Sequence, residues 1–257
     1  MASRDRSRKL PVSQAPRPRW SPALIEGVVA GEAAVLGAVL ARETPEATVE
    51  AAATALVRAE ELAGAAIARD PGATPIACRA GCSSCCAAKV VVTAPEILRI
   101  AAHLRETRDE ASLDALRERV RAIDAQTRGK TRQERAALGL RCPLLDESGS
   151  CSVHAVRPLH CLGWTSFDAA ACERHWAAPG ESLAPPHHDD VYELASAVLA
   201  GLGRACFEVG LDGSLLELIA ALRIALERPS AGERWQKRLP VFSTAIDAEW
   251  RAPRERA

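Results

Sequence analysis

Apolar residues recur at helical spacing through the first part of the chain. Residues 22–41 and 45–69 are rich in Ala, Leu, Val and Glu. Before the second segment, Thr44, Pro45 and Glu46 supply an N-cap, a proline for the first turn and an early acid. The pattern predicts one helix in each segment.

The next two predicted helices follow a dense group of cysteines. Residues 93–104 begin with Thr93 and Glu96, which have the spacing of a capping box. A fourth helix is predicted from a run of apolar residues that would share one helix face, namely Leu113, Leu116, Val120 and Ile123.

Two more helices are predicted near the C-terminus. We expect Asp190 and Glu193 to cap the first, whose apolar stripe comprises Val191, Ala195, Val198, Leu202, Cys206 and Val209. We expect Ser214 and Glu217 to start the second, which carries Leu215, Leu218, Leu222 and Ala225. Because Cys206 lies on this apolar stripe, we expect its side chain to be buried in the core.

Strand signals are scarce. Residues 89–92 look extended, and residues 141–153 resemble a hairpin with Gly149 at its turn. The predicted fold is mostly α: an irregular helical domain built round a cysteine-lined metal centre, with a small β-hairpin. Four regions are expected along it: a disordered basic tail (1–20), N-terminal helices (21–75), a cysteine-cluster metal-binding region (76–180), and C-terminal helices packing on the same core (181–250).

Composition and charge narrow the possible partners. A chain of 257 residues can bury a large core without disulfides. Lys plus Arg and Asp plus Glu are 33 each, so no excess of positive charge points to nucleic acid. The N-terminus lacks the apolar run of a signal peptide, and no segment has roughly 20 uninterrupted apolar residues. We therefore expect a cytoplasmic protein that binds neither nucleic acid nor a membrane.

The chemistry is concentrated in the cysteines. Of nine in the chain, eight are predicted metal ligands: Cys78, Cys82, Cys85, Cys86, Cys142, Cys151, Cys161 and Cys172. A reducing cytoplasm favours metal or redox chemistry over disulfides. Thiolate is a soft donor suited to zinc, copper(I) and iron–sulfur clusters, whereas magnesium and calcium prefer oxygen.

The spacing of the first group leaves the number of centres open. It reads C-x3-C-x2-C-C, and Gly81 permits a tight turn that brings Cys78, Cys82 and Cys85 round one centre. Neighbouring side chains diverge, so Cys86 is expected to serve a second ion, a bridged centre, or chemistry beside the first centre.

Other side chains near the cysteines are candidates for secondary roles. Four cations could offset thiolate charge or donate hydrogen bonds to sulfur: Arg79, Lys89, Arg141 and Arg157. Three histidines are further candidate ligands: His154, His160 and His175.

Two known sequence patterns resemble the cysteine groups. The C-x3-C-x2-C spacing is shared with radical S-adenosylmethionine enzymes, but Ser84 stands where those enzymes usually have an aromatic residue, and no strand–helix repeat is visible. The full pattern over residues 76–165 is similar to the YkgJ-like cysteine-cluster family, described as a zinc- or iron-chelating domain. The matching elements are Cys78, Cys82, Cys85, Cys86, Cys142-Pro143-Leu144-Leu145, Gly149, Cys151, Arg157-Pro158 and Cys161.

The resemblance implies a metal centre, and the C-x3-C-x2-C turn with a distant cysteine favours a 4Fe–4S cluster slightly over zinc. Two other functions stay open. The family looks related to flagellin lysine N-methylases, which implies S-adenosylmethionine-dependent modification of a protein side chain. Exchangeable thiolates would instead suit a metal-buffering or delivery module. The substrate or partner, a protein or a small molecule, is not indicated.

Overall fold

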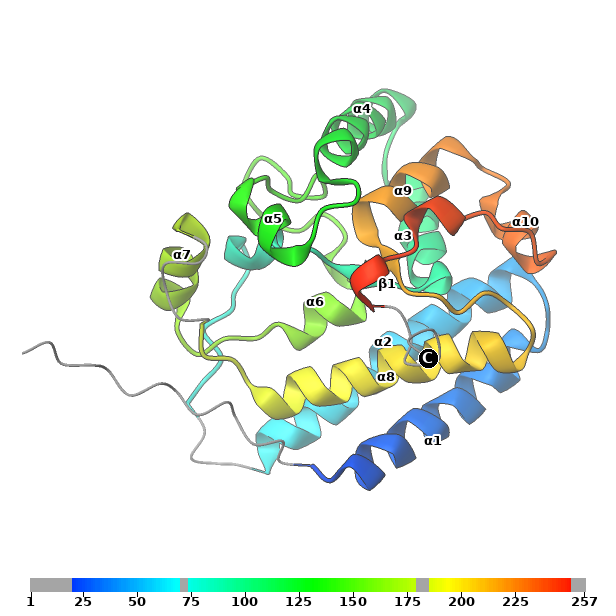
Figure 1. Ribbon diagram of the computed structural model, residues 1–257, viewed down its shortest axis with the longest axis horizontal. Coiled ribbons are helices and arrows are strands. Elements are labelled where there is room, and N and C mark those ends of the chain that lie inside the picture. Colours follow the sequence, from blue (N-terminus) through cyan, green and yellow to red (C-terminus); the bar gives the residue numbers. More distant parts are fainter. Residues whose placement is uncertain (1–19, 70–73, 179–184, 251–257) are drawn as a thin grey trace, which may run out of the picture.

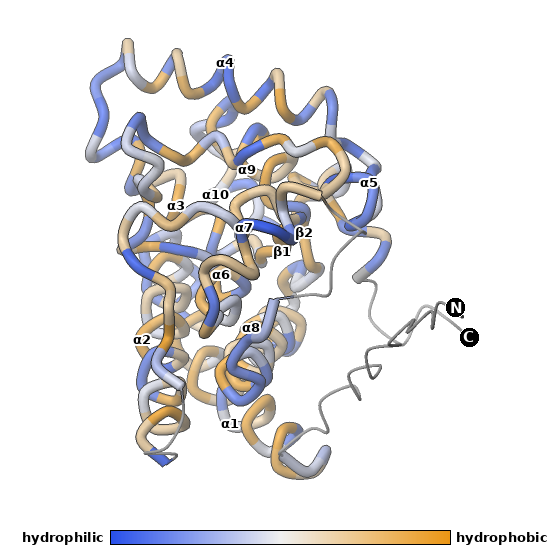
Figure 2. Tube along the Cα trace, turned by 90° about the vertical axis from the view of Figure 1, so that its left-hand side faces the viewer, coloured by the Kyte–Doolittle hydropathy of each residue, from blue (hydrophilic) through white to orange (hydrophobic). Residues whose placement is uncertain are grey.

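The computed structural model describes residues 20–69, 74–178 and 185–250, and nearly all of the predicted basic tail lies outside them. The fold is mostly α, as predicted. Three long helices form one side of the molecule (Figure 1): α1 (Pro22–Leu40), α2 (Pro45–Ala68) and α8 (Asp189–Glu208). They pack on one another, and Figure 2 shows hydrophobic stretches along them.

The crossing of α1 and α8 is close because α8 has a glycine at the contact. A Cβ on Gly201 would lie 2.7 Å from Cβ of Glu32 in α1. The Glu32 side chain is buried and accepts a hydrogen bond from Arg58 of α2 at 2.8 Å. This charge pair joins α1 to α2 next to the place where both approach α8.

Helix α1 also has the length and apolar composition of a membrane span. Its apolar window has a mean hydropathy of 1.9, and 28% of that window is buried in the protein. Core helices of soluble proteins meet the same criteria, and Glu26 and Glu32 interrupt the apolar run. Among the described residues, α1 is therefore the segment on which the predicted absence of membrane contact should be tested.

A second group of helices covers the other side of the core. It contains α3 (Ala94–Thr107), α4 (Glu110–Thr127), α9 (Leu218–Glu227) and α10 (Ala231–Gln236). Helix α9 packs on both α3 and α4, and α2 packs on α3, so the two groups share one hydrophobic core. There are also short helices α5 (Arg132–Ala137), α6 (Leu159–Gly163) and α7 (Ala169–Ala177); α6 packs on α8, and α7 lies at the left edge of Figure 1.

The small sheet joins segments far apart in the sequence. Strand β1 (Val91–Val92) pairs antiparallel with β2 (Leu216–Glu217). The prediction that a helix starts at Ser214 is wrong, because residues 216–217 are extended to form this pair. Helix α9 begins afterwards, and the Glu217 side chain caps it by accepting from the Ala220 N–H at 2.7 Å.

The other predicted local features are mostly confirmed. Thr93 and Glu96 form the capping box of α3. The hairpin-like segment 141–153 contains one antiparallel bridge, between Leu145 and Cys151, and Gly149 has φ of 80° at its turn. The predicted Asp190 cap of α8 is wrong, because Asp189 and Asp190 already lie within the first turn of the helix.

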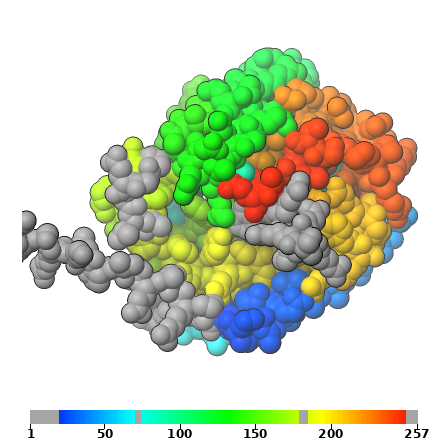
Figure 3. Space-filling view, viewed as in Figure 1, coloured from blue at the N-terminus to red at the C-terminus, as the bar shows by residue number. Residues whose placement is uncertain are grey.

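The C-terminal part of the described chain closes over the cysteine region. Figure 3 shows the red residues before position 250 lying against the green residues of α4 and α5. Lys89, buried next to the first cysteine group, forms ion pairs with Asp247 and Glu249, each at 2.7 Å. Two distant parts of the sequence are thereby joined at the edge of the site.

Candidate metal centre

The first cysteine group lies on a loop followed by a short 3-10 helix. Gly81 has φ of 79°, which allows the turn between Cys78 and Cys82. Cys85 and Cys86 lie on the 3-10 helix η1 (Ser84–Ala87). The predicted glycine turn is therefore present, and the four cysteines of this group lie round one cavity.

The second group comes from three further segments. Cys142 follows α5, Cys151 lies in the bridged turn, and Cys161 is on α6. Backbone hydrogen bonds connect these segments to the first group: the Cys142 N–H donates to the Cys86 carbonyl at 2.8 Å, and the Ala77 N–H donates to the Ser166 carbonyl at 2.7 Å. Helices α3 and α4 are looped out between the groups, as the sequence predicts.

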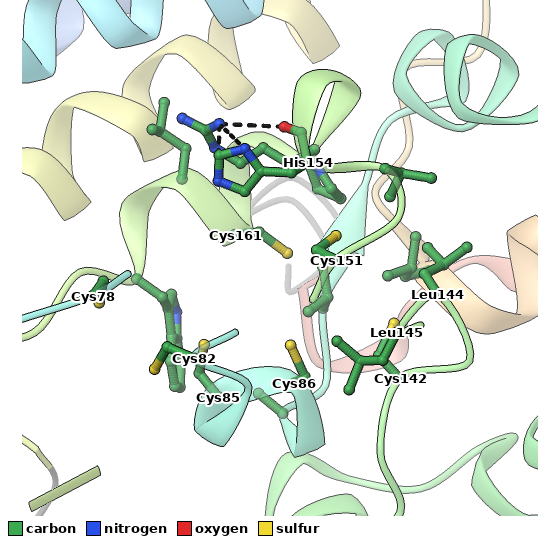
Figure 4. A pocket seen from close by; sticks show the side chains of 18 of the residues that line it. Cys78, Cys82, Cys85, Cys86, Cys142, Leu144, Leu145, Cys151, His154 and Cys161 are labelled. Atoms are coloured by element: carbon green, nitrogen blue, oxygen red, sulfur yellow. Dashed lines mark hydrogen bonds between the residues drawn. The ribbon is translucent and has the colours of Figure 1, made fainter. Parts of the chain in front are cut away.

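The two groups meet at a cavity of about 460 Å³. Seven of the eight predicted ligands line it (Figure 4): Cys78, Cys82, Cys85, Cys86, Cys142, Cys151 and Cys161. In Figure 4 the sulfur atoms of Cys86, Cys151 and Cys161 point into the same space from three different segments. A cavity of this size is in the range of small-molecule sites and is much larger than a bare metal ion needs.

The thiols surround the cavity without closing on one point. Among the described residues, no three Cys, His, Asp or Glu side chains lie close enough together to hold a single ion. One zinc ion with four thiolates at about 2.3 Å would require sulfur atoms about 3.8 Å apart. The side chains must therefore move inward to bind one ion, or bind a larger group as they are.

The eighth predicted ligand is placed differently. Cys172 is buried on α7 and is not among the described residues that line the cavity. It lies near Ser166, whose backbone N–H donates to the Cys78 sulfur at 3.3 Å. Cys206 lies in the hydrophobic core with no exposed surface, as predicted.

Burial raises the pKa of several of the cavity thiols. It raises the pKa of Cys142 to about 12 and the pKa of Cys161 well above its usual value. The pKa of Cys85 is raised by a hydrogen bond with Cys86 and by burial. Thiolate is the form that binds metal, so loading a metal here must release protons.

Of the three candidate histidines, one lines the cavity. His154 lines the cavity. His160 points elsewhere and stacks on Trp164 with ring centroids 6.0 Å apart, and burial lowers its pKa to about 4. His175 lies edge-on to Trp176, outside the cavity lining. By position, His154 is the histidine that could reach a metal in the cavity.

Of the four candidate cations, two line the cavity. Arg79 and Arg157 line the cavity, and Arg157 is held by an ion pair with Glu60 at 2.6 Å. Lys89 instead pairs with the two C-terminal acids, and Arg141 donates to the Ser83 hydroxyl at 2.6 Å. Neither Lys89 nor Arg141 is among the described lining residues.

One functional candidate is missed by the sequence reasoning. Arg135, on α5, is only 2% exposed and lines the cavity. In the sequence it is one more charged residue in a polar segment, 131–136, and it stands seven positions before the next cysteine. Its burial depends on the packing of α5 against the cysteine segments, which the local pattern does not reveal.

The donor set fits a metal. Seven thiols line one cavity, and beside them lies the buried guanidinium of Arg135, whose Nε and Nη1 atoms have no hydrogen-bond partner among the described residues. Thiolate ligands suit zinc or an iron–sulfur cluster, and the cation suits the negative charge that such a centre carries.

Comparison with known proteins agrees with this chemistry. Residues 77–176 match the CxxCxxCC family model, described as "Putative zinc- or iron-chelating domain". The matched range contains all eight predicted ligands. No curated protein and no solved structure matches the chain. The family match supports metal binding and confirms the resemblance seen in the sequence.

Proposed function

We propose that the protein binds an iron–sulfur cluster, of the 4Fe–4S type, in the cysteine-lined cavity of the segment that matches the CxxCxxCC family model. The observation that carries the proposal is the arrangement of the thiols: seven line a cavity of about 460 Å³, yet no three described ligand side chains are close enough for one ion. Each cysteine of a cluster binds a different iron, so the sulfur atoms can stay further apart than around a single zinc ion.

Four of the thiols form the best candidate ligand set. After burial, the thiols of Cys142, Cys85 and Cys151 contribute to the raised pKa of Cys161, and the thiol of Cys85 contributes to that of Cys151, so these four groups lie close enough to interact. These four come from the 3-10 helix, the post-α5 loop, the bridged turn and α6. Because the ligands come from four segments, a bound metal would link these segments to one another. Metal binding would therefore stabilise the tertiary fold.

Zinc is the alternative metal. The same thiols could close on a zinc ion if the segments that carry them moved inward, and such a site would stabilise the fold. Anaerobic purification followed by elemental analysis and a visible spectrum separates the two. We expect a brown protein with about four irons per chain. A colourless protein that holds zinc and takes up no iron on reconstitution would refute the cluster and keep the metal site.

A chelator experiment tests whether the metal is resident or cargo. A resident metal should resist exchange with the chelator while the chain stays folded, and the chain should unfold when the metal is finally removed. Rapid exchange without loss of helical signal would favour the metal-buffering function instead. We place the protein in the cytoplasm, because its nine cysteines are free thiols and a reducing compartment keeps them so.

A further inference from the structure

Arg135 is held rigidly in a buried position. It lies on α5, which begins with a capping box formed by Thr131 and Glu134, and its own backbone N–H donates to the Thr131 carbonyl at 2.8 Å. Its side chain is 2% exposed and lines the cysteine cavity. The capped helix therefore fixes a guanidinium at the wall of the site.

Two of the three guanidinium nitrogens of Arg135 lack partners in the described part of the chain. The Nε and Nη1 atoms of Arg135 are buried and have no hydrogen-bond partner there. Burial lowers the pKa of Arg135, yet arginine stays charged in proteins. An unpaired buried charge is strongly unfavourable, so the side chain requires an acceptor that is bound in the working protein.

The nearest acidic groups point to sulfur as that acceptor. Arg135 is close enough to Glu217 and Cys142 for both to act on its charge. Glu217 is engaged elsewhere, since its Oε2 caps α9 at the Ala220 N–H. Cys142 is a predicted metal ligand. The indole Nε1 of Trp164, also on the cavity lining, is a second buried donor that has no partner in the ranges the structure describes.

The charge of a loaded centre matches these donors. A divalent ion with four thiolates carries a formal charge of minus two, and N–H groups directed at sulfur stabilise such a centre. We propose that Arg135 is a positioning residue of the metal centre, which offsets the thiolate charge and donates hydrogen bonds to the Cys142 sulfur. This inference rests on the proposed metal-binding function.

A small anionic ligand is the competing partner for Arg135. In the loaded centre a carboxylate or phosphate would face the thiolates and lie near Glu217 as well, so its own charge would be repelled. The thiolates form when the metal binds and are already part of the cavity wall. The charges around Arg135 therefore favour sulfur as its partner, and binding of an anion is one outcome of the test.

The test compares metal retention in three variants of the full chain, purified anaerobically with the metal that wild type holds. Arg135→Met removes the charge, and Arg135→Lys keeps it. Arg141→Gln is the matched control, because Arg141 precedes Cys142 but donates to Ser83 outside the cavity lining. Loss of metal to a chelator and the sulfur-to-metal absorption bands are measured for each.

We expect Arg135→Met to lose metal about 10- to 100-fold more readily than wild type and to shift the absorption bands. Arg135→Lys should recover part of the retention, and Arg141→Gln should behave as wild type. In the metal-free chain Arg135→Met should be no less thermally stable than wild type, because it removes an unpaired buried charge.

Three results would overturn the inference. The first is Arg135→Met with wild-type retention and spectrum. The second is equal destabilisation of the metal-free and metal-loaded chains, which would indicate a packing role. The third is stabilisation of the loaded wild type, but not of Arg135→Met, by millimolar phosphate or acetate, which would indicate an anion site. Failure of wild type itself to hold metal would instead refute the proposed function.

Discussion

The backbone N–H of Cys142 donates a hydrogen bond to the carbonyl of Cys86 at 2.8 Å, although 56 residues separate them, and this bond joins the two halves of the cysteine site. It holds the post-α5 loop against the 3-10 helix. Because it uses backbone atoms, it persists when either side chain is changed. Serine substitutions in the site should therefore report on metal binding rather than on the pairing of these segments.

The first prediction concerns the four candidate ligands. Cys142→Ser and Cys161→Ser should each lose most of the bound metal, because serine is a poor ligand for the soft metals that thiolate binds. The measurement is metal per chain after anaerobic purification. Cys206→Ser is the matched control, since Cys206 lies in the core away from the cavity, and it should hold as much metal as wild type. Equal loss in all three variants would point to general misfolding.

The second prediction concerns the cysteine outside the cavity lining. The Cys172→Ser variant should retain the main centre. Cys172 lies on α7 with its side chain near Ser166, and it is not among the described residues that line the cavity. A small decrease in metal per chain would be consistent with a second ion at Cys78, Cys82 and Cys172. Complete loss of the centre in Cys172→Ser would show that α7 moves into the site on loading and would contradict the placement.

The third prediction concerns the residue that anchors α6. Glu96 caps α3 through Thr93 and also accepts the Leu159 N–H at 2.9 Å, two residues before Cys161. Glu96→Gln should lower the free energy of unfolding by about 1–3 kcal/mol, because an amide leaves buried donors unpaired. Urea denaturation followed by circular dichroism measures it.

The matched control for Glu96 is the exposed capping box of α5. Glu134 makes the same bonds to Thr131, at 2.8 and 2.9 Å, but is exposed and accepts from no second segment in the described chain. Glu134→Gln should cost about 0.5 kcal/mol. If the two substitutions proved equally costly, the bond from Leu159 to Glu96 would contribute nothing to stability.

The fourth prediction is a pH dependence at the same residue. Burial raises the pKa of Glu96 above its unfolded value of 4.5. The folded chain then binds more protons than the unfolded chain over this interval, so the contribution of Glu96 is full below pH 4.5 and is lost as pH rises through the folded pKa. The stability advantage of wild type over Glu96→Gln should shrink from pH 4 toward pH 7. An advantage that grows over that interval would reverse the assigned sign.

The fifth prediction concerns the ion pairs at the edge of the site. Lys89 is 8% exposed and binds both Asp247, whose side chain is 1% exposed, and Glu249. Lys89→Met should destabilise the fold by about 3–5 kcal/mol, because it removes the ammonium group that offsets the charge of the buried Asp247 carboxylate. Arg42→Gln breaks a comparable but exposed pair with Glu50 and should cost less than about 1 kcal/mol. Thermal unfolding of both variants compares the two pairs.

Local chemistry along the chain was enough to predict most of the helices. The Thr44 cap, the Thr93–Glu96 box and the glycine turns at 81 and 149 are each decided within a few residues, and each is present. The start of α9 was misplaced because residues 216–217 form a strand whose partner, β1, lies about 125 residues earlier in the chain. No local pattern contains that pairing.

For the site, the sequence by itself determined the kind of chemistry: eight cysteines in two groups, with glycine at the turn, are soft ligands spaced for a metal. Tertiary structure alone decided which of them share a cavity, because the backbone bond between Cys142 and Cys86 and the packing of α6 on α8 bring separate segments together. It also decided that Arg135, and neither Arg141 nor Lys89, lines that cavity. The physical reason is that ligand type is a property of each side chain, whereas burial and charge neighbours arise from long-range packing.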